Sequence, residues 1–97
     1  MFSARLIRHQ DTNMLNICDS DLLGKTLNRD NFSLKIREEY YAEKTIEKEE
    51  AKDLLKQSDN INMVGKNIID LSVSIGIGSE NGVKVIDGIP FLIVFKM

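Results

Sequence analysis

Ile61-Asn62-Met63-Val64-Gly65-Lys66-Asn67-Ile68-Ile69-Asp70-Leu71-Ser72-Val73-Ser74-Ile75 is the stretch of this 97-residue chain that decides the fold. Its apolar residues recur at intervals of three and four, as the series Ile61, Val64, Ile68, Leu71 and Ile75. This spacing predicts one helix over 61–75 with a single apolar face. Gly76 then suits the left-handed position that follows a helix in a Schellman ending, with Ile77 as the apolar residue after it.

An alternative exists at the end of this stretch. Leu71, Val73, Ile75 and Ile77 alternate with small polar residues and glycines, as they would in a strand. The helix is preferred because its period begins ten residues earlier. Gly65 costs this helix about 1 kcal/mol relative to alanine, so its presence indicates close approach of another backbone, such as a strand. A partner surface is the alternative explanation for Gly65.

The segment before this stretch predicts a second, shorter helix. Thr45 suits the N-cap, and three glutamates follow in the first turns, where the helix dipole favours acids. Ile46, Ala51, Leu54 and Leu55 form a narrow apolar stripe. The polar run 58–60 ends the helix.

Strands are predicted on both sides of the two helices. Segments 2–8 and 14–18 flank the polar run 9–13 and predict a hairpin with His9 in its exposed loop. Phe32, Leu34 and Ile36 alternate with polar residues, which predicts a strand over 32–37 with those three side chains inward. Segments 83–86 and 91–95 predict a second hairpin, whose last strand is central or buried on both faces.

Between the first hairpin and the 32–37 strand lies a predicted turn. Asp19 suits the cap of a single helical turn over 20–23, and Gly24 suits its end. The resulting order is β-β-β-α-α-β-β. We therefore expect one α+β domain over 1–97, a mainly antiparallel sheet with two helices packed on it.

Composition excludes several classes of protein. Thirteen basic and fifteen acidic residues give a net charge of -2, which argues against a generally basic, DNA-binding protein. Cys18 is the only cysteine, so neither an internal disulfide nor a cysteine-based metal site can form. No apolar run approaches the roughly twenty residues that cross a membrane, and no signal peptide precedes the chain. We expect a cytoplasmic protein with no cofactor, no metal and no membrane partner.

Charge is distributed unevenly along the chain. Residues 1–37 carry a net charge of +2, and residues 38–59 carry -4. The candidate phosphate-binding residues are the basic ones on or beside the early strands: Arg5, Arg8, Lys25, Lys35 and Arg37. Tyr40 and Tyr41 are the candidates for stacking on bases. An enzyme using Asp19, Asp21 or Asp87 is the alternative, although the sequence shows no base or nucleophile positioned beside them.

Four motifs together resemble one known family. They are Cys18-Asp19-Ser20-Asp21-Leu22-Leu23-Gly24-Lys25, Glu38-Glu39-Tyr40-Tyr41, Asn62-Met63-Val64-Gly65 and Val85-Ile86-Asp87-Gly88-Ile89-Pro90. In order and spacing they resemble the archaeal family called domain of unknown function 424. The resemblance implies a single-domain, cytoplasmic α+β protein with no established activity. Relatives commonly have histidine where this chain has Phe91, so a catalytic role at that position is disfavoured.

The resemblance also suggests a partner, because genes of this family often lie near those of translation factors. We therefore expect a non-catalytic binding module that contacts the ribosome, RNA or a translation factor. A small enzyme, or a protein-protein adaptor without RNA contact, is the alternative.

Overall fold

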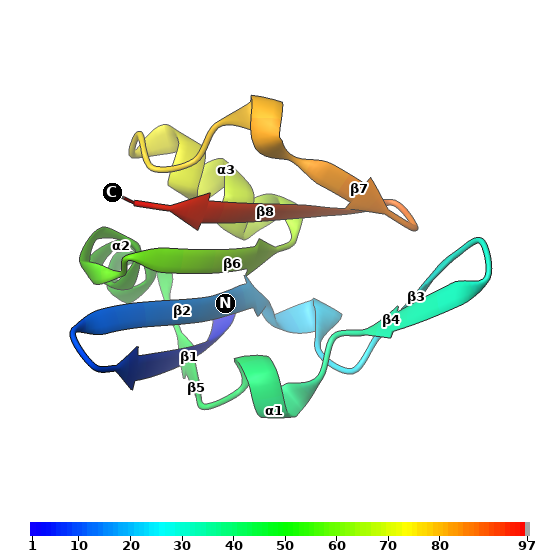
Figure 1. The fold of residues 1–97 in the computed structure, drawn as a ribbon, viewed down its shortest axis with the longest axis horizontal. Coiled ribbons are helices and arrows are strands. Elements are labelled where there is room, and N and C mark those ends of the chain that lie inside the picture. The colour runs from blue at the N-terminus through cyan, green and yellow to red at the C-terminus, as the bar shows by residue number, and fades with distance from the viewer. Residues whose placement is uncertain (97) are drawn as a thin grey trace.

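The structure is a computed structural model that describes residues 1–96, shown in Figure 1. Its strands are β1 (Phe2–His9), β2 (Thr12–Asp19), β3 (Thr26–Arg29), β4 (Phe32–Lys35), β5 (Lys44–Ile46), β6 (Asn60–Val64), β7 (Lys84–Ile86) and β8 (Ile89–Phe95). Its α-helices are α1 (Glu38–Tyr41), α2 (Lys48–Gln57) and α3 (Lys66–Ser74). Single 3-10 turns lie at Ser20–Leu22 and Glu80–Gly82.

Six strands form one sheet in the order β5-β1-β2-β6-β8-β7, and β3 and β4 form a separate two-stranded sheet. Only the β2–β6 pair is parallel. The predicted α+β class and the mostly antiparallel sheet are confirmed. The predicted element order is wrong, because β3, β5, β6 and α1 were not expected.

The stretch 61–75 is a strand followed by a helix, not the single predicted helix. Ile61 lies in β6 between Leu15 and Val94 of the neighbouring strands. Gly65, with a φ of +116°, separates β6 from α3. The helical spacing of Ile61 and Val64 is a coincidence, because residues three apart in a strand face opposite sides. These two side chains accordingly belong to two different hydrophobic clusters.

The end of α3 confirms the prediction made for Gly76. This residue has a φ of +79°, and its amide donates to the carbonyl of Val73 at 3.0 Å. The amide of Ile77 donates to the carbonyl of Ser72 at 2.9 Å. These two bonds define a Schellman motif. The half-buried Ile77 packs against the main core.

Two hydrophobic clusters lie on opposite faces of the six-stranded sheet. Ala4, Ile17, Met63 and Leu92 form one row across four strands, and they belong to the main cluster with α2 and α3. The adjacent row contains Cys18, Val64 and Phe91, which belong to the second cluster. Leu22, Leu27, Ile36 and Tyr41 cover this second row. The main cluster with α2 and α3 therefore covers one face of the sheet, and the second cluster covers one end of the opposite face.

Two local predictions need correction, and a third is confirmed in one of its two forms. Thr45 is not an N-cap but pairs with Ser3 in the short edge strand β5, so α2 begins only at Lys48. Ala51, Leu54 and Leu55 of α2 are buried as predicted. Of the predicted inward-facing residues 32, 34 and 36, only Ile36 is buried. β8 is an inner strand of the sheet, which confirms the prediction that the last strand is central. The other alternative, burial on both faces, does not hold, because Ile93 is 60% exposed.

Candidate functional site

A basic hairpin projects from the main sheet. It comprises β3 and β4 with their flanking residues, 25–37, and we call it the arm (Figure 1). Two backbone bonds close its base, from Gly24 to Ile36 at 2.8 Å and from Ile36 to Lys25 at 2.9 Å. Leu27 and Ile36 anchor it in the second cluster. Beyond this base every residue of β4 is exposed, and Phe32 near the tip is 55% exposed.

The arm carries a concentrated positive charge. Four of its side chains are basic and one is acidic, a net of +3 within thirteen residues of a chain whose total is -2: Lys25, Arg29, Lys35 and Arg37 against Asp30. Arg37 makes an exposed ion pair with Glu39, with 3.7 Å between Nη1 and Oε2. No ion pair holds the other three basic side chains among residues 1–96. Within the described part of the chain, the charges of Lys25, Arg29 and Lys35 therefore form no ion pair that would stabilise the folded protein.

The five predicted phosphate-binding residues do not share one place. Lys25, Lys35 and Arg37 lie on the arm. Arg5 lies on β1, and its Nη1 donates to the carbonyl of Glu39, which ties α1 to the sheet. Arg8 lies on β1 at the end beside the β1–β2 turn, where it pairs with Asn13, and Figure 1 shows that turn at the opposite side of the molecule from the arm. The arm is therefore the only cluster within the predicted set.

A small aromatic pocket lies at the base of the arm. Its volume is about 240 Å³, and its walls include Leu34, Lys35, Arg37, Tyr40, Tyr41 and Phe91. Tyr40 is 53% exposed, whereas Tyr41 and Phe91 are half-buried against the second cluster. Burial raises the pKa of the Tyr41 phenol, and the Cys18 thiol group adds to that effect. The pocket thus combines fixed aromatic walls with two cationic side chains.

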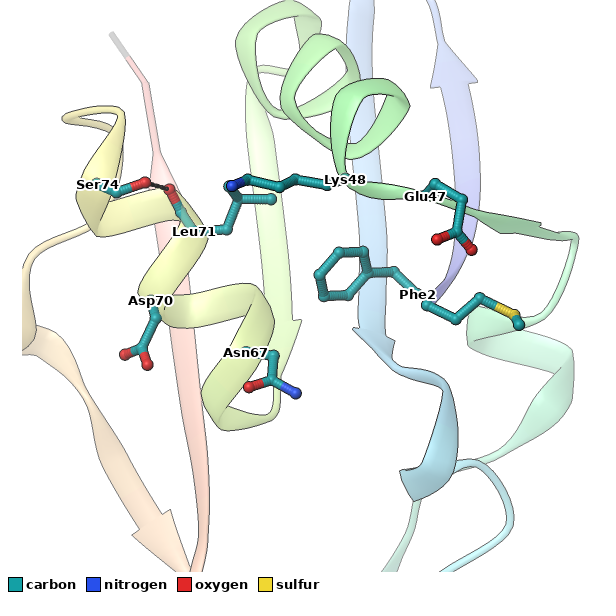
Figure 2. Close-up of a pocket in the computed structure, with 8 residues that line it drawn as sticks. Phe2, Glu47, Lys48, Asn67, Asp70, Leu71 and Ser74 are labelled. Atoms are coloured by element: carbon teal, nitrogen blue, oxygen red, sulfur yellow. Dashed lines mark hydrogen bonds between the residues drawn. The ribbon is translucent and has the colours of Figure 1, made fainter.

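A larger groove of about 430 Å³ lies between α2 and α3. Figure 2 shows the ring of Phe2 between its two walls, with the carboxylates of Glu47 and Asp70 on opposite sides. Asp70 also holds an ion pair with Lys66 at 2.6 Å. The negative charge of these two carboxylates disfavours a phosphate. The larger groove is a weaker candidate than the pocket.

Asp19 is a buried carboxylate with a structural role. Its Oδ2 accepts from the amide of Asn67 at 3.0 Å, and its Oδ1 accepts from the amide of Ile68 at 2.9 Å. The last residue of β2 therefore caps α3, although the sequence suggested that it caps the turn at 20–23, where it makes no side-chain bond. Burial raises the pKa of Asp19, and the two amide bonds oppose that rise without cancelling it.

Gly65 makes this capping contact sterically feasible. A Cβ atom at Gly65 would stand 2.5 Å from both Cγ and Oδ2 of Asp19. The prediction that Gly65 marks a close packing contact is thus correct, but the close neighbour is the carboxylate of Asp19 and not the backbone of a strand. The residue also precedes α3 instead of lying inside a helix.

The remaining candidates for catalysis are dispersed. Asp21 is exposed, and Asp87 lies in the β7–β8 turn, where its Oδ2 accepts from the amide of Asn28 at 3.1 Å. Burial, with added effects of Asp19 and Asp21, raises the pKa of the Cys18 thiol to about 12. A buried neutral thiol is not a nucleophile at neutral pH. Asp21, Asp87 and Cys18 therefore form no arrangement of nucleophile and base with one another.

Sequence reasoning did not assign Arg29, Phe32 or Phe91 to the site. Arg29 lies in the segment 25–37, which has four basic residues and one acidic residue. The net charge of this segment alone would have pointed to Arg29. Phe32 was assigned to the core because it alternates with polar residues. Phe91 comes to the pocket from the other end of the chain, and no local pattern predicts such a contact.

Neither a candidate metal centre nor a membrane-spanning helix is found among residues 1–96. No group of three histidine, cysteine, aspartate or glutamate side chains in this part of the chain could hold a metal ion. No helix there has the length and apolar character needed to cross a membrane.

Comparison with known proteins gives a family and a fold. A crystal structure of an uncharacterized conserved protein from Methanopyrus kandleri matches with a TM-score of 0.81 at 24% identity, over 99% of this chain and 93% of the other. This likeness shows a shared fold, and its source is consistent with the archaeal origin that the resemblance implied. No curated protein matches. The model of the family described as protein of unknown function (DUF424) matches residues 7–97. The chain belongs to this family.

Proposed function

We propose that this protein is a non-catalytic module that binds RNA through its arm. The observation that carries the proposal is the net charge of +3 on a projecting hairpin of an acidic protein. Clustered lysine and arginine side chains bind phosphates and release counterions from the nucleic acid. Because most of the arm is exposed and makes few ion pairs, its charges are available for such contacts.

Two further features support RNA as the partner. Phe32 and Tyr40 are exposed aromatic side chains on and beside the arm, and exposed aromatics stack on unpaired bases. The segment 43–59, which has six acidic residues against four lysines, would in contrast repel a phosphate backbone. The expected link with translation makes ribosomal RNA the first RNA to test.

The test is a titration of fluorescently labelled RNA with the protein, repeated at several salt concentrations. We expect affinity to fall with salt, with a slope of about 0.7–0.9 per phosphate contact. The variant K25Q/R29Q/K35Q should bind more weakly, and its slope should be lower by about 2, since three contacts are lost.

Two matched variants control for charge and position. The variant K48Q/K52Q/K56Q loses the same three charges from α2, and R8Q loses one at the far end of β1. Both should retain the affinity and salt slope of the native protein. If the arm variant binds like the native protein, or if the α2 variant weakens equally, the proposal is wrong. A protein partner would then be the better hypothesis.

A further inference from the structure

We propose that the aromatic pocket at the base of the arm receives a single unstacked nucleobase, so that the protein binds single-stranded RNA segments. The inference rests on the proposed RNA binding and names the form of RNA and the place of contact. Its aromatic part does not depend on the charge of the arm, because Tyr40, Tyr41 and Phe91 lie outside residues 25–37.

The size and walls of the pocket select the ligand. A volume of about 240 Å³ is below the roughly 300–1,000 Å³ of pockets that enclose whole drug-sized molecules. It suits one flat ring system. Tyr40, Tyr41 and Phe91 supply aromatic surface, and every base has a face that stacks on such surface.

The surroundings of the pocket select a ring attached to an anionic chain. Lys35 and Arg37 line the pocket from the arm, so a base inside it has phosphates within reach of these cations. An aromatic molecule without an anionic group would form no ion pair with these two side chains. Bases in a duplex are stacked and paired, so only a single strand, a loop or a bulge can place one in the pocket.

Exposure of Tyr40 is consistent with this role. It lies on α1, a helix of four residues with none buried, and its side chain remains 53% exposed. Tyr41, the next residue, is half-buried and packs on the second cluster. Tyr40 thus leaves aromatic surface accessible to a base that contacts Tyr41 and Phe91 in the pocket.

The experiment compares three probes of equal length: a single-stranded RNA, the same ribose-phosphate chain without bases, and a duplex. For the native protein, we expect the chain with bases to bind about 5- to 150-fold more tightly than the chain without bases. The variant Y40A should lose most of this factor on the single strand, where Tyr41 and Phe91 remain, and lose nothing on the other two probes. Its salt slope should remain native, because no phosphate contact is removed.

Two variants keep the result interpretable. Y40F retains the ring and should bind like the native protein, and F95A removes an exposed aromatic side chain from β8, outside the pocket. F95A should also bind like the native protein. Circular dichroism and thermal unfolding of Y40A establish that it is folded.

The outcomes separate the two proposals. If RNA binds with an arm-dependent salt slope but Y40A equals the native protein on the single strand, the pocket inference is overturned and the proposed function stands. If Y40A weakens all three probes equally, the tyrosine acts on the shape of the arm and the pocket inference is again overturned. If no probe binds at low salt, both proposals fail.

Discussion

The six-stranded sheet and the arm differ in what holds them together. In the sheet and the helices packed on it, every polar side chain that is buried has a partner: Ser3 with Ser20, Asp19 with α3, Ser58 and Ser72 with backbone carbonyls. In the arm, only Leu27 and Ile36 are buried, and most polar side chains face water. These buried polar residues therefore contribute to the stability of the folded protein. The basic residues of the arm make no comparable contacts, which is why we assign them to binding.

Substitution of one core residue should separate the two regions most strongly. Leu71→Asp places a charge in the main cluster, where Leu71 is buried on α3, and should destabilise the protein by about 3–5 kcal/mol. Leu34→Asp on the exposed strand β4 should cost less than about 1 kcal/mol. Urea unfolding measures both changes. Similar midpoint shifts for the two variants would contradict the distinction between sheet and arm.

Two glycine substitutions test the contact between β2 and α3. Gly65→Ala should destabilise by about 2–4 kcal/mol, because its φ of +116° strains any side chain and its Cβ would overlap the carboxylate of Asp19. Gly88→Ala also has a positive φ but an open surrounding, so it should cost only about 1–2 kcal/mol. The comparison is made by thermal unfolding. Equal costs would show that the carboxylate moves aside freely.

The same contact shows how far the sequence allowed prediction. Local signals at Gly76 and Ile77 gave the end of α3 correctly, because a Schellman motif depends only on neighbouring residues. The strand β6 was missed because Ile61 and Val64 fit a helical spacing, and only pairing with β2 and β8 decides between the two periods. The capping of α3 by Asp19 joins residues almost fifty positions apart, which no local rule covers.

The candidate site was predicted only in part, because a sequence pattern again identifies only residues that lie close together along the chain. Lys25, Lys35 and Arg37 are close in sequence, and a hairpin keeps them close in space. Arg5 and Arg8 lie on β1, and nothing in their own segment indicates their distance from the arm. Tyr40 and Tyr41 were predicted as candidates for stacking on bases, which stays a prediction, and the pocket that they line also depends on Phe91 of the last strand.

The pH dependence of stability tests the buried carboxylate of Asp19, with a smaller expected effect than the substitutions above. Burial raises the pKa of Asp19 in the folded state above its value in the unfolded chain, despite two amide hydrogen bonds. The folded state therefore holds this proton more tightly, so stability from Asp19 is present at low pH and is lost as pH rises through the raised pKa. The difference in unfolding free energy between the native protein and D19N should fall across that window. A difference that rises with pH would mean that the two amide hydrogen bonds, and not burial, dominate the pKa of Asp19.

Neutralising the arm should have the smallest effect on stability. In K25Q/R29Q/K35Q, three exposed charges disappear from a segment with few ion pairs, and exposed charges contribute little to folding. We expect a change within about 0.5 kcal/mol, in the stabilising direction at low salt, because repulsion among like charges is relieved. The change should vanish at high salt, where the charges are screened. Urea unfolding at two salt concentrations measures it. A loss above about 1 kcal/mol would mean that these side chains hold the arm in place, and their role in binding would then need another basis.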